Sequence, residues 1–180
     1  MNDPTARIKS RIHTIPDHPK PGILFRDITT LLQDADGFRL AVLGLADPFR
    51  GTRIDKVAGV EARGFILGGA VALELGAGFV PVRKAGKLPR TTIGQSYALE
   101  YGTDRVEIHT DAISRGEKVL LVDDLVATGG TLEAAIRVVQ ASGGEVVGAA
   151  VVIDLPDLGG RQRIEALGHK LVSLCAFEGE

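Results

Sequence analysis

The chain has 180 residues, a length that fits one domain with a full hydrophobic core. Its 21 lysine and arginine residues nearly balance its 23 aspartate and glutamate residues, and because the two signs are mixed along the chain we expect no nucleic acid partner. No apolar run reaches the roughly 18 residues that span a membrane, and the polar start lacks the pattern of a secretion signal, so we expect a cytoplasmic protein without membrane association.

The N-terminal part of the chain is predicted to be a short helix followed by an irregular arm. Ile8 and Ile12 lie on one helical stripe, and the prolines within 16–21 interrupt it. Segment 23–29 then places an aromatic residue beside a cation and an acid, but it is too short to build a core by itself. The residues alone favour a loop pinned by Phe25 and a ligand-binding segment equally.

After residue 36, helical and strand patterns alternate. We expect helices over 40–49, 66–75, 132–142 and 160–167, and strands over 53–59, 78–82, 105–109, 119–122, 146–153 and 171–174. This alternation predicts an α/β fold with a mostly parallel, twisted sheet flanked by helices. The segment 91–98 has no clear period, and we expect a mobile loop there. Cys175 is the only cysteine and is expected in the core.

The stretch 119–131 combines a short buried strand, two acids and a glycine turn that opens a helix. Gly129 and Gly130 lack Cβ atoms, so the backbone can adopt a positive φ and direct several N–H groups onto one anion. Thr128 and Thr131 add hydroxyl donors, and the positive end of the helix dipole faces the same point. The turn is therefore a candidate phosphate site.

The acidic pair Asp123 and Asp124 is expected to end the strand. Carboxylates repel phosphate, so this pair suits sugar hydroxyls or a magnesium ion beside the phosphate. A sugar phosphate would satisfy both the pair and the turn. Neither the Walker A pattern nor the dinucleotide-binding pattern occurs in the chain. The alternative is an ordinary strand-to-helix turn with incidental glycines and exposed acids.

Cations follow two other predicted strands. Arg63 stands at a helix start, where the dipole disfavours a cation unless an anion lies between, although a surface ion pair is the alternative. The second set of cations consists of Arg83, Lys84, Lys87 and Arg90. These four positive charges repel one another unless they stay in water or bind an anion. Because ligands of parallel sheets bind at the carboxyl ends of the strands, we expect these cations near the acidic pair.

The stretch 119–131 resembles the phosphoribosyl pyrophosphate (PRPP) signature of the type I phosphoribosyltransferases, in which apolar residues lead to two acids and a T-G-G-T turn. Further segments resemble those of the adenine phosphoribosyltransferases, namely 21–28, 59–65, 83–89 and 99–102. The resemblance implies a type I phosphoribosyltransferase fold in one domain, 1–180, with residues 1 to about 35 forming an arm and a small hood. It also implies purine salvage, in which adenine and PRPP give AMP and pyrophosphate.

The resemblance assigns a role to each matching residue. The 5′-phosphate would bind at Ala127, Thr128, Gly129, Gly130 and Thr131, and the ribose hydroxyls at Asp123 and Asp124. Pyrophosphate would bind at Arg63, Arg83, Lys84 and Lys87, and adenine at Leu24, Phe25 and Arg26. Glu100 would exchange a proton with the purine, and Tyr97 and Tyr101 would belong to a lid over 88–101.

The same resemblance implies a homodimer and a Mg²⁺ cofactor held mainly by PRPP, with no dedicated protein site. It also implies a cis peptide bond between Glu61 and Ala62. Two alternatives stay open. A phosphoribosyltransferase for a 6-oxopurine would keep the phosphate site but need another base pocket. A PRPP-sensing regulator would carry an added DNA-binding domain, whereas only a short arm precedes the first predicted helix.

Overall fold

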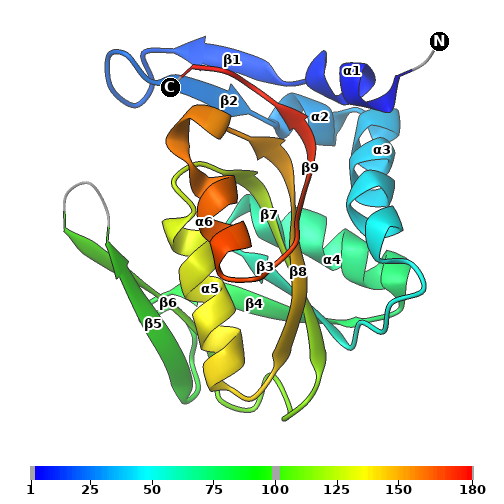
Figure 1. Cartoon of the computed structure of the whole chain (residues 1–180). Helices are drawn as coiled ribbons and strands as arrows, with labels where there is room; N and C mark the ends of the chain where they lie inside the picture. The colour runs from blue at the N-terminus through cyan, green and yellow to red at the C-terminus, as the bar shows by residue number, and fades with distance from the viewer. Residues whose placement is uncertain (1–2, 99–101, 180) are drawn as a thin grey trace.

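The computed structural model describes residues 3–98 and 102–179 (Figure 1). The helices are α1 (Pro4–Lys9), α2 (Thr29–Gln33), α3 (Ala35–Ala46), α4 (Arg63–Leu75), α5 (Gly130–Ala141) and α6 (Gly160–Ala166), with short 3₁₀ helices η1 (Asp47–Phe49) and η2 (Pro156–Leu158). The strands are β1 (His13–Pro16), β2 (Leu24–Asp27), β3 (Lys56–Val60), β4 (Gly78–Lys84), β5 (Thr92–Ala98), β6 (Thr103–His109), β7 (Lys118–Val126), β8 (Glu145–Asp154) and β9 (Leu171–Ala176).

Over the described residues, a seven-stranded sheet has the order β5-β6-β4-β3-β7-β8-β9. The neighbours from β4 to β9 pair in parallel, whereas β5 and β6 add an antiparallel hairpin at one edge. The predicted α/β fold with a mostly parallel sheet is confirmed. Because the central strands are parallel, their carboxyl ends meet along one edge, and the turns after β3 and β7 lie there together.

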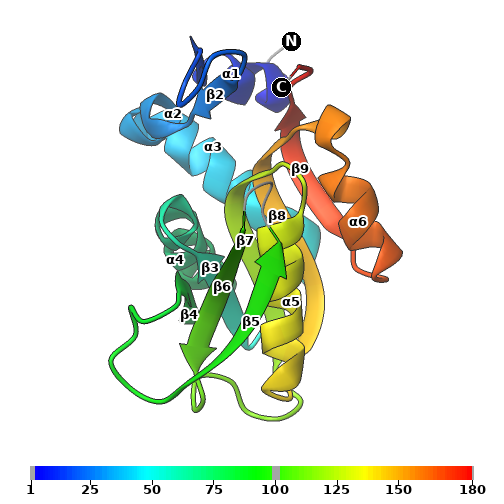
Figure 2. The ribbon, with the colours of Figure 1, turned by 90° about the vertical axis from the view of Figure 1, so that its left-hand side faces the viewer.

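The central strand β7 is buried on both faces, as its unbroken apolar run predicts. Val119 and Leu121 pack into the cluster that contains α5, whereas Leu120 and Val122 pack into the cluster that contains α3 and α4. All four side chains have no exposed surface. Figure 2 shows the sheet with α5 on one face and α4 on the other. This double layer of helices makes the strand a rigid support for the turn that follows it.

The N-terminal segment forms a hood above the carboxyl edge of the sheet (Figure 1). The short helix α1 contains Ile8 but ends before Ile12, and it begins at Pro4, where the Asp3 carboxylate accepts the N–H of Thr5 at 3.0 Å. The prediction of an irregular arm is wrong, since β1 and β2 form an antiparallel ladder in which Ile15 faces Phe25. Each short strand satisfies the backbone groups of the other, a pairing that no local pattern reveals.

Two further predictions of secondary structure are wrong. The expected loop over 91–98 is strand β5, because it pairs with β6 from Thr92 to Ala98 and its partly buried Ile93 and Tyr97 pack against the core. The acidic pair does not end β7, which continues to Val126 because the longer β8 pairs with it as far as Asp154. In both cases the partner strand supplies backbone hydrogen bonds, and these compensate for the weak preference of the local residues for a strand.

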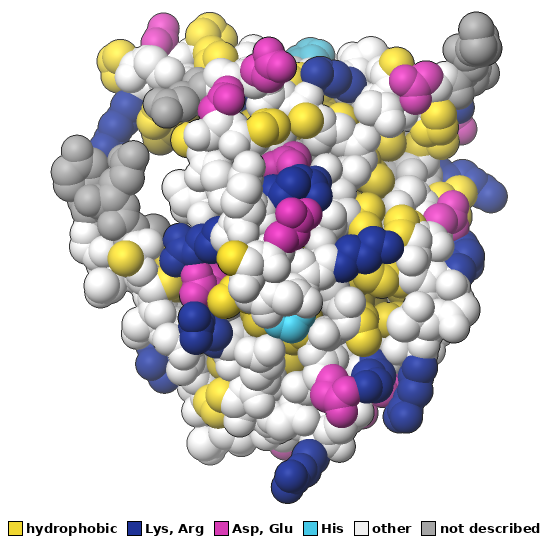
Figure 3. Space-filling model, in the orientation of Figure 1, with side chains coloured by type: hydrophobic (Ala, Val, Ile, Leu, Met, Phe, Trp, Pro, Cys, Tyr) yellow, Lys and Arg dark blue, Asp and Glu magenta, His cyan; other side chains and the backbone are white. Residues whose placement is uncertain are grey.

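Cys175 lies in the core as predicted, with 4% of its surface exposed, and burial raises the pKa of its thiol to about 11. No described helix has both the length and the apolar character needed to cross a membrane. On the face in Figure 3, basic and acidic side chains lie next to each other rather than in blocks of one sign. Glu133, for example, forms ion pairs with both Arg137 and Arg163.

Candidate active site

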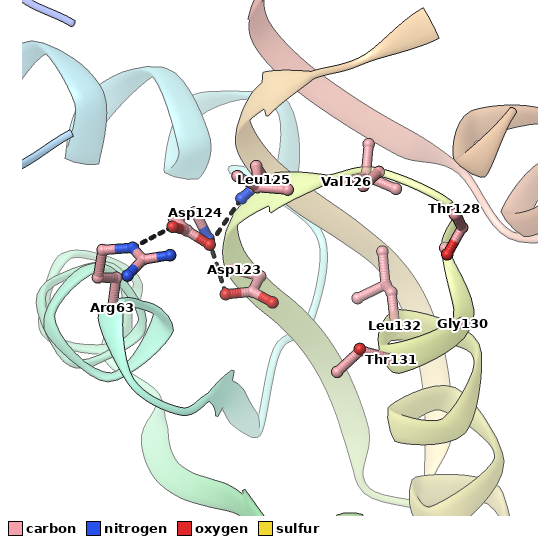
Figure 4. Close-up of a pocket in the computed structure, with 11 residues that line it drawn as sticks. Arg63, Asp123, Asp124, Leu125, Val126, Thr128, Gly130, Thr131 and Leu132 are labelled. Atoms are coloured by element: carbon pink, nitrogen blue, oxygen red, sulfur yellow. Dashed lines mark hydrogen bonds and ion pairs between the residues drawn. The ribbon is translucent and has the colours of Figure 1, made fainter. Parts of the chain in front are cut away.

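A polar cavity of about 180 Å³ lies at the carboxyl ends of β3 and β7. Arg63 lines one side, and residues 123–132 line the other (Figure 4). The structure thus brings Arg63 together with the acidic pair and the glycine turn, although Arg63 precedes Asp123 by 60 residues in the chain. This is the juxtaposition that the rule for parallel sheets predicts.

The glycine turn reaches α5 through a left-handed residue. Gly129 has a φ of 80°, and a Cβ atom there would lie 3.0 Å from the carbonyl oxygen of Gly160. Gly130 has no positive φ, and a Cβ atom there would lie 3.5 Å from Cδ2 of Tyr97, an ordinary contact. The expectation that both glycines provide a positive φ is therefore right only for Gly129.

The difference in φ between Gly129 and Gly130 predicts which of two alanine variants binds PRPP more weakly. Gly129→Ala places a side chain in the left-handed region, which costs about 1–2 kcal/mol and turns N–H groups away from the phosphate. We expect the Kd for PRPP to rise at least about 10-fold in Gly129→Ala, and to rise less in Gly130→Ala. Isothermal titration of both variants with PRPP measures this order. Equal affinities would contradict the assignment of the positive φ to phosphate binding.

The acidic pair is largely enclosed. Asp124 is 5% exposed and forms an ion pair with Nε of Arg63, and the N–H of Leu125 donates to Oδ1 of Asp124 at 2.9 Å (Figure 4). Burial and the neighbouring Asp124 carboxylate raise the pKa of Asp123 well above its usual range. Arg63 is half-buried, which disfavours its charge, but the Asp124 carboxylate outweighs this and raises the pKa of the guanidinium.

The alternative of an ion pair for Arg63 is thus realised, although its partner is a buried member of the same cavity and not a surface acid. One arginine faces two carboxylates in this group. The excess negative charge suits a cation or sugar hydroxyl donors, while the glycine turn beside it suits an anion.

The remaining predicted pyrophosphate cations do not line this cavity. Glu61 accepts from Nε of Arg83 at 2.8 Å and from Nζ of Lys87 at 3.2 Å. Burial disfavours the Glu61 charge, but these hydrogen bonds outweigh it and lower the Glu61 pKa. Nζ of Lys84 lies 3.0 Å from Oδ2 of Asp104. Carboxylates that the sequence analysis did not pair with these cations therefore neutralise Arg83, Lys84 and Lys87 in this structure, although Lys84 and Lys87 stay about half exposed. Arg90, the fourth cation of the set, forms an ion pair with the exposed Asp111.

Glu61 also begins the turn that delivers Arg63. The peptide bond between Glu61 and Ala62 is cis, which confirms the prediction. The N–H of Glu61 donates to the carbonyl of Val82 at 3.0 Å, so this turn is attached to the neighbouring strand β4. One residue thus anchors the turn through its backbone and the cations through its side chain.

An apolar cavity of about 260 Å³ adjoins the polar one. Its hood side contains the predicted adenine residues, and its full lining is Ile23, Leu24, Phe25, Arg26, Leu125, Ala127, Leu155 and Leu158. Leu125 and Ala127 line both cavities. A flat apolar group and a sugar phosphate can therefore bind side by side. The sequence analysis missed the three leucines at 125, 155 and 158, although Leu155 lies two residues after the predicted strand 146–153 and the rule for strand ends could have found it.

Arg26 lines the apolar cavity, but its side chain is engaged elsewhere. It is 6% exposed, and its guanidinium donates to Oγ1 of Thr14 at 2.6 Å and to the carbonyl of Glu178 at 2.9 Å. Its buried Nε has no hydrogen-bond partner among the described residues, so the predicted contact of Arg26 with a purine is left to this atom, its backbone or its aliphatic stem.

The predicted lid residues are only partly described. Tyr97 lies on β5 close to Gly130, and its hydroxyl donates to Oδ2 of Asp104 at 3.2 Å. Burial raises the pKa of Tyr97. Glu100 and Tyr101 lie outside the described residues, so their roles remain predictions. The described part defines a class of protein, an α/β protein in which a polar cavity suited to a sugar phosphate adjoins an apolar cavity suited to a flat ring.

Comparisons with known proteins identify this class further. The family described as Phosphoribosyl transferase domain matches residues 39–170. The adenine phosphoribosyltransferase of Parvibaculum lavamentivorans is 64% identical over 96% of this chain and 98% of its own length. The crystal structure of the Rhodothermus marinus enzyme of the same name superposes with a TM-score of 0.92 at 51% identity, covering 97% of this chain and 98% of the other.

A further relative was crystallised with ligands. The adenine phosphoribosyltransferase of Saccharomyces cerevisiae, in complex with adenine and an imino-altritol bisphosphate, has a TM-score of 0.88 and 37% identity over 95% of this chain and 98% of the other. The chain therefore belongs to the phosphoribosyltransferase family and, within it, to the adenine phosphoribosyltransferases.

Proposed function

We propose that the two adjoining cavities divide the work of the family reaction, in which this chain transfers the phosphoribosyl group of PRPP to adenine and releases AMP and pyrophosphate. The observation that carries this division is the pair of residues, Leu125 and Ala127, that lines both cavities. A base in the apolar cavity would lie against a sugar phosphate in the polar one. The new C1′–N bond then forms where the cavities meet.

The glycine turn holds the 5′-phosphate in this proposal. Residues 127–131 supply backbone N–H groups and two hydroxyls at the start of α5. Asp123 and Asp124 accept from the ribose hydroxyls beside it. Asp124 also forms an ion pair with Arg63, which binds the leaving pyrophosphate in this proposal. One buried carboxylate therefore positions both the ribose and the group that holds the pyrophosphate.

The cations serve the leaving group. As the C1′–O bond breaks, positive charge develops on the ribose and negative charge on the departing pyrophosphate, so electrostatic stabilisation dominates the barrier. Arg63 already lies in the polar cavity. Arg83, Lys84 and Lys87 would exchange their carboxylate partners, Glu61 and Asp104, for pyrophosphate oxygens. Pairing before the substrate arrives keeps the cations ordered.

The carboxylates of Asp123 and Asp124 are suited to bind magnesium. Carboxylate oxygens are the ligands that Mg²⁺ prefers, and the raised pKa of Asp123 marks a negative site that a cation would relieve. Among the described residues no group of three potential metal ligands occurs, so the ion would be shared with PRPP. When bound, magnesium supplies charge neutralisation for the pyrophosphate.

Adenine binds between the hood and the leucines in this proposal, with Leu24 and Phe25 against one side. Glu100 takes or gives the purine proton, and Tyr97 and Tyr101 belong to the lid that excludes water from the cationic sugar. The arrangement occupies one domain, 1–180, with the hood at about 1–35.

The experiment that tests this function follows AMP formation from radiolabelled adenine. Product should require PRPP and should fall when magnesium is chelated. Unlabelled adenine should compete, whereas hypoxanthine and xanthine should not, since the alternative reading as a 6-oxopurine enzyme needs a different base pocket. Product formation without PRPP, or equal competition by hypoxanthine, would overturn the proposal.

We also expect a homodimer, because apolar side chains are exposed on α4. Ile66 is 49% exposed and Leu73 is 87% exposed, and their spacing of seven residues places them on one face of the helix. The cations of 83–90 would then lie near the partner's site. Sedimentation velocity should show a dimer that Leu73→Glu weakens. An active monomer at assay concentration would contradict this expectation.

A further inference from the structure

The segment that follows β9 contacts both walls of the apolar cavity without lining it. Figure 1 shows this segment, in red, running beside the hood hairpin. One wall of the cavity is the hood strand β2 with Leu24 and Arg26, and the other is the turn around η2 with Leu155 and Leu158. The two walls are more than 120 residues apart in the sequence, so their separation depends on contacts made elsewhere.

The contacts of this segment with the hood converge on Arg26. The guanidinium of Arg26 donates to the carbonyl of Glu178 at 2.9 Å and lies 4.7 Å from the centre of the Phe177 ring. Nζ of Lys9, on α1, lies 4.6 Å from the same ring. Two cations of the hood therefore lie against one aromatic side chain, which is partly buried against the core.

The contacts with the other wall are made by backbone N–H groups. The N–H of Gly179 donates to Oδ2 of Asp157 at 2.8 Å, and Asp157 is the middle residue of η2. The N–H of Phe177 donates to the carbonyl of Asp154, at the end of β8, at 3.0 Å. A Cβ atom at Gly179 would also lie 3.4 Å from Cδ1 of Leu24, so this residue reaches from one wall to the other.

We propose that residues 177–179 form a brace that sets the width of the base cavity, attached to the hood through Arg26 and to η2 through Asp157. The proposal rests on the assignment of this cavity to adenine. Arg26 and Asp157 are positioning residues here, because Nη2 of Arg26 and Oδ2 of Asp157 bind the brace and act on the base only through it. This role explains why the Arg26 guanidinium is buried and turned to the brace, although its residue lines the cavity.

The width of the cavity matters because a planar base gains mainly dispersion contacts with the walls. A gap of 0.5–1 Å beyond contact distance loses about a quarter to a half of each such contact. Loosening the brace should therefore weaken adenine binding. PRPP binding should be unaffected, because none of the brace contacts described above involves residues 127–131.

The test compares Asp157→Ala and Phe177→Ala, which alter the two attachments from outside the cavity. Asp157 is exposed, so its variant should fold normally, and Glu145→Ala is a matched control at an exposed acid on the opposite end of β8. We expect the KM for adenine to rise about 5- to 10-fold in each brace variant, with the KM for PRPP within about 2-fold of the parent. Asp157→Asn, which keeps an acceptor, should restore most of the loss.

An unchanged KM for adenine in both variants would overturn the brace. A parallel rise of both KM values with a lower Tm would also overturn it, because that pattern indicates general destabilisation. Phe25→Ala separates this failure from a failure of the site assignment. If Phe25→Ala raises the KM for adenine while the brace variants do not, only the brace is wrong. If Phe25→Ala has no effect either, the cavity is not the adenine site.

Discussion

Gly160→Ala is expected to lower kcat/KM for PRPP by about 100-fold, although Gly160 lies outside the predicted motif. A Cβ atom at this position would overlap the carbonyl oxygen of Ala127 and lie 2.6 Å from Cγ2 of Val126 and 2.9 Å from the N atom of Gly129. The N–H of Gly160 also donates to the carbonyl of Ala127 at 2.9 Å. The added methyl must therefore displace the phosphate turn, and a shift of about 1 Å can cost about 10²-fold in rate.

The matched control is Gly69→Ala, in the middle of α4. A Cβ atom at Gly69 meets no other atom within 4 Å, so this variant should gain slight helix stability. Gly69 lies between Ile66 and Leu73 on the face of α4 expected in the dimer contact, so parent activity is expected once sedimentation velocity shows an unchanged oligomeric state. Steady-state kinetics with varied PRPP, together with thermal unfolding of both variants, measures the difference. A Gly160→Ala enzyme that folds and keeps the parent kcat/KM for PRPP would show that the contact with α6 does not position the turn.

Glu100→Gln is expected to lower kcat by about 10²- to 10⁴-fold while leaving the Kd for PRPP nearly unchanged. The physical reason is that glutamine keeps the size and one acceptor of glutamate but cannot transfer a proton to or from the purine. Glu100 lies outside the described residues, so the expectation follows from the resemblance of the segment 99–102 alone. Single-turnover AMP formation and PRPP titration measure the two quantities separately.

Glu100→Leu provides the comparison, because it also removes the acceptor and should be worse than Glu100→Gln. Unaltered kcat in both variants would reduce Glu100 to a residue of the lid. Adenine recognition would then depend on Leu24, Phe25 and backbone groups around Arg26.

Local sequence patterns were sufficient for the central strand of the fold and for the grouping of the acids and glycines that follow it. The apolar run 119–122 predicted a strand buried on both faces, and the acids and glycines after it line one polar cavity. Such a unit is predictable because backbone freedom, helix dipole and charge act over neighbouring residues. The cis peptide at Glu61 was predictable only through the resemblance, since no pattern of residue types implies it.

Local patterns failed for segments and side chains whose partners are distant in the chain. The strand β5 and the hood hairpin were expected as irregular segments, because their ladders depend on partner strands that the local residues do not reveal. For the cations at 83–87, the fold places Glu61 and Asp104 beside them, and the local sequence did not predict these partners.

The sequence by itself determined the class of fold and the family, and it predicted which residues carry phosphate, sugar and base chemistry. The tertiary structure alone decided the second wall of the apolar cavity, the contact of Gly160 with the glycine turn, and the contacts of residues 177–179 with Arg26 and Asp157. The physical reason is that residue type and spacing determine local backbone conformation and burial. The distance between two walls is determined instead by strand order and by contacts that close only when the whole chain has folded.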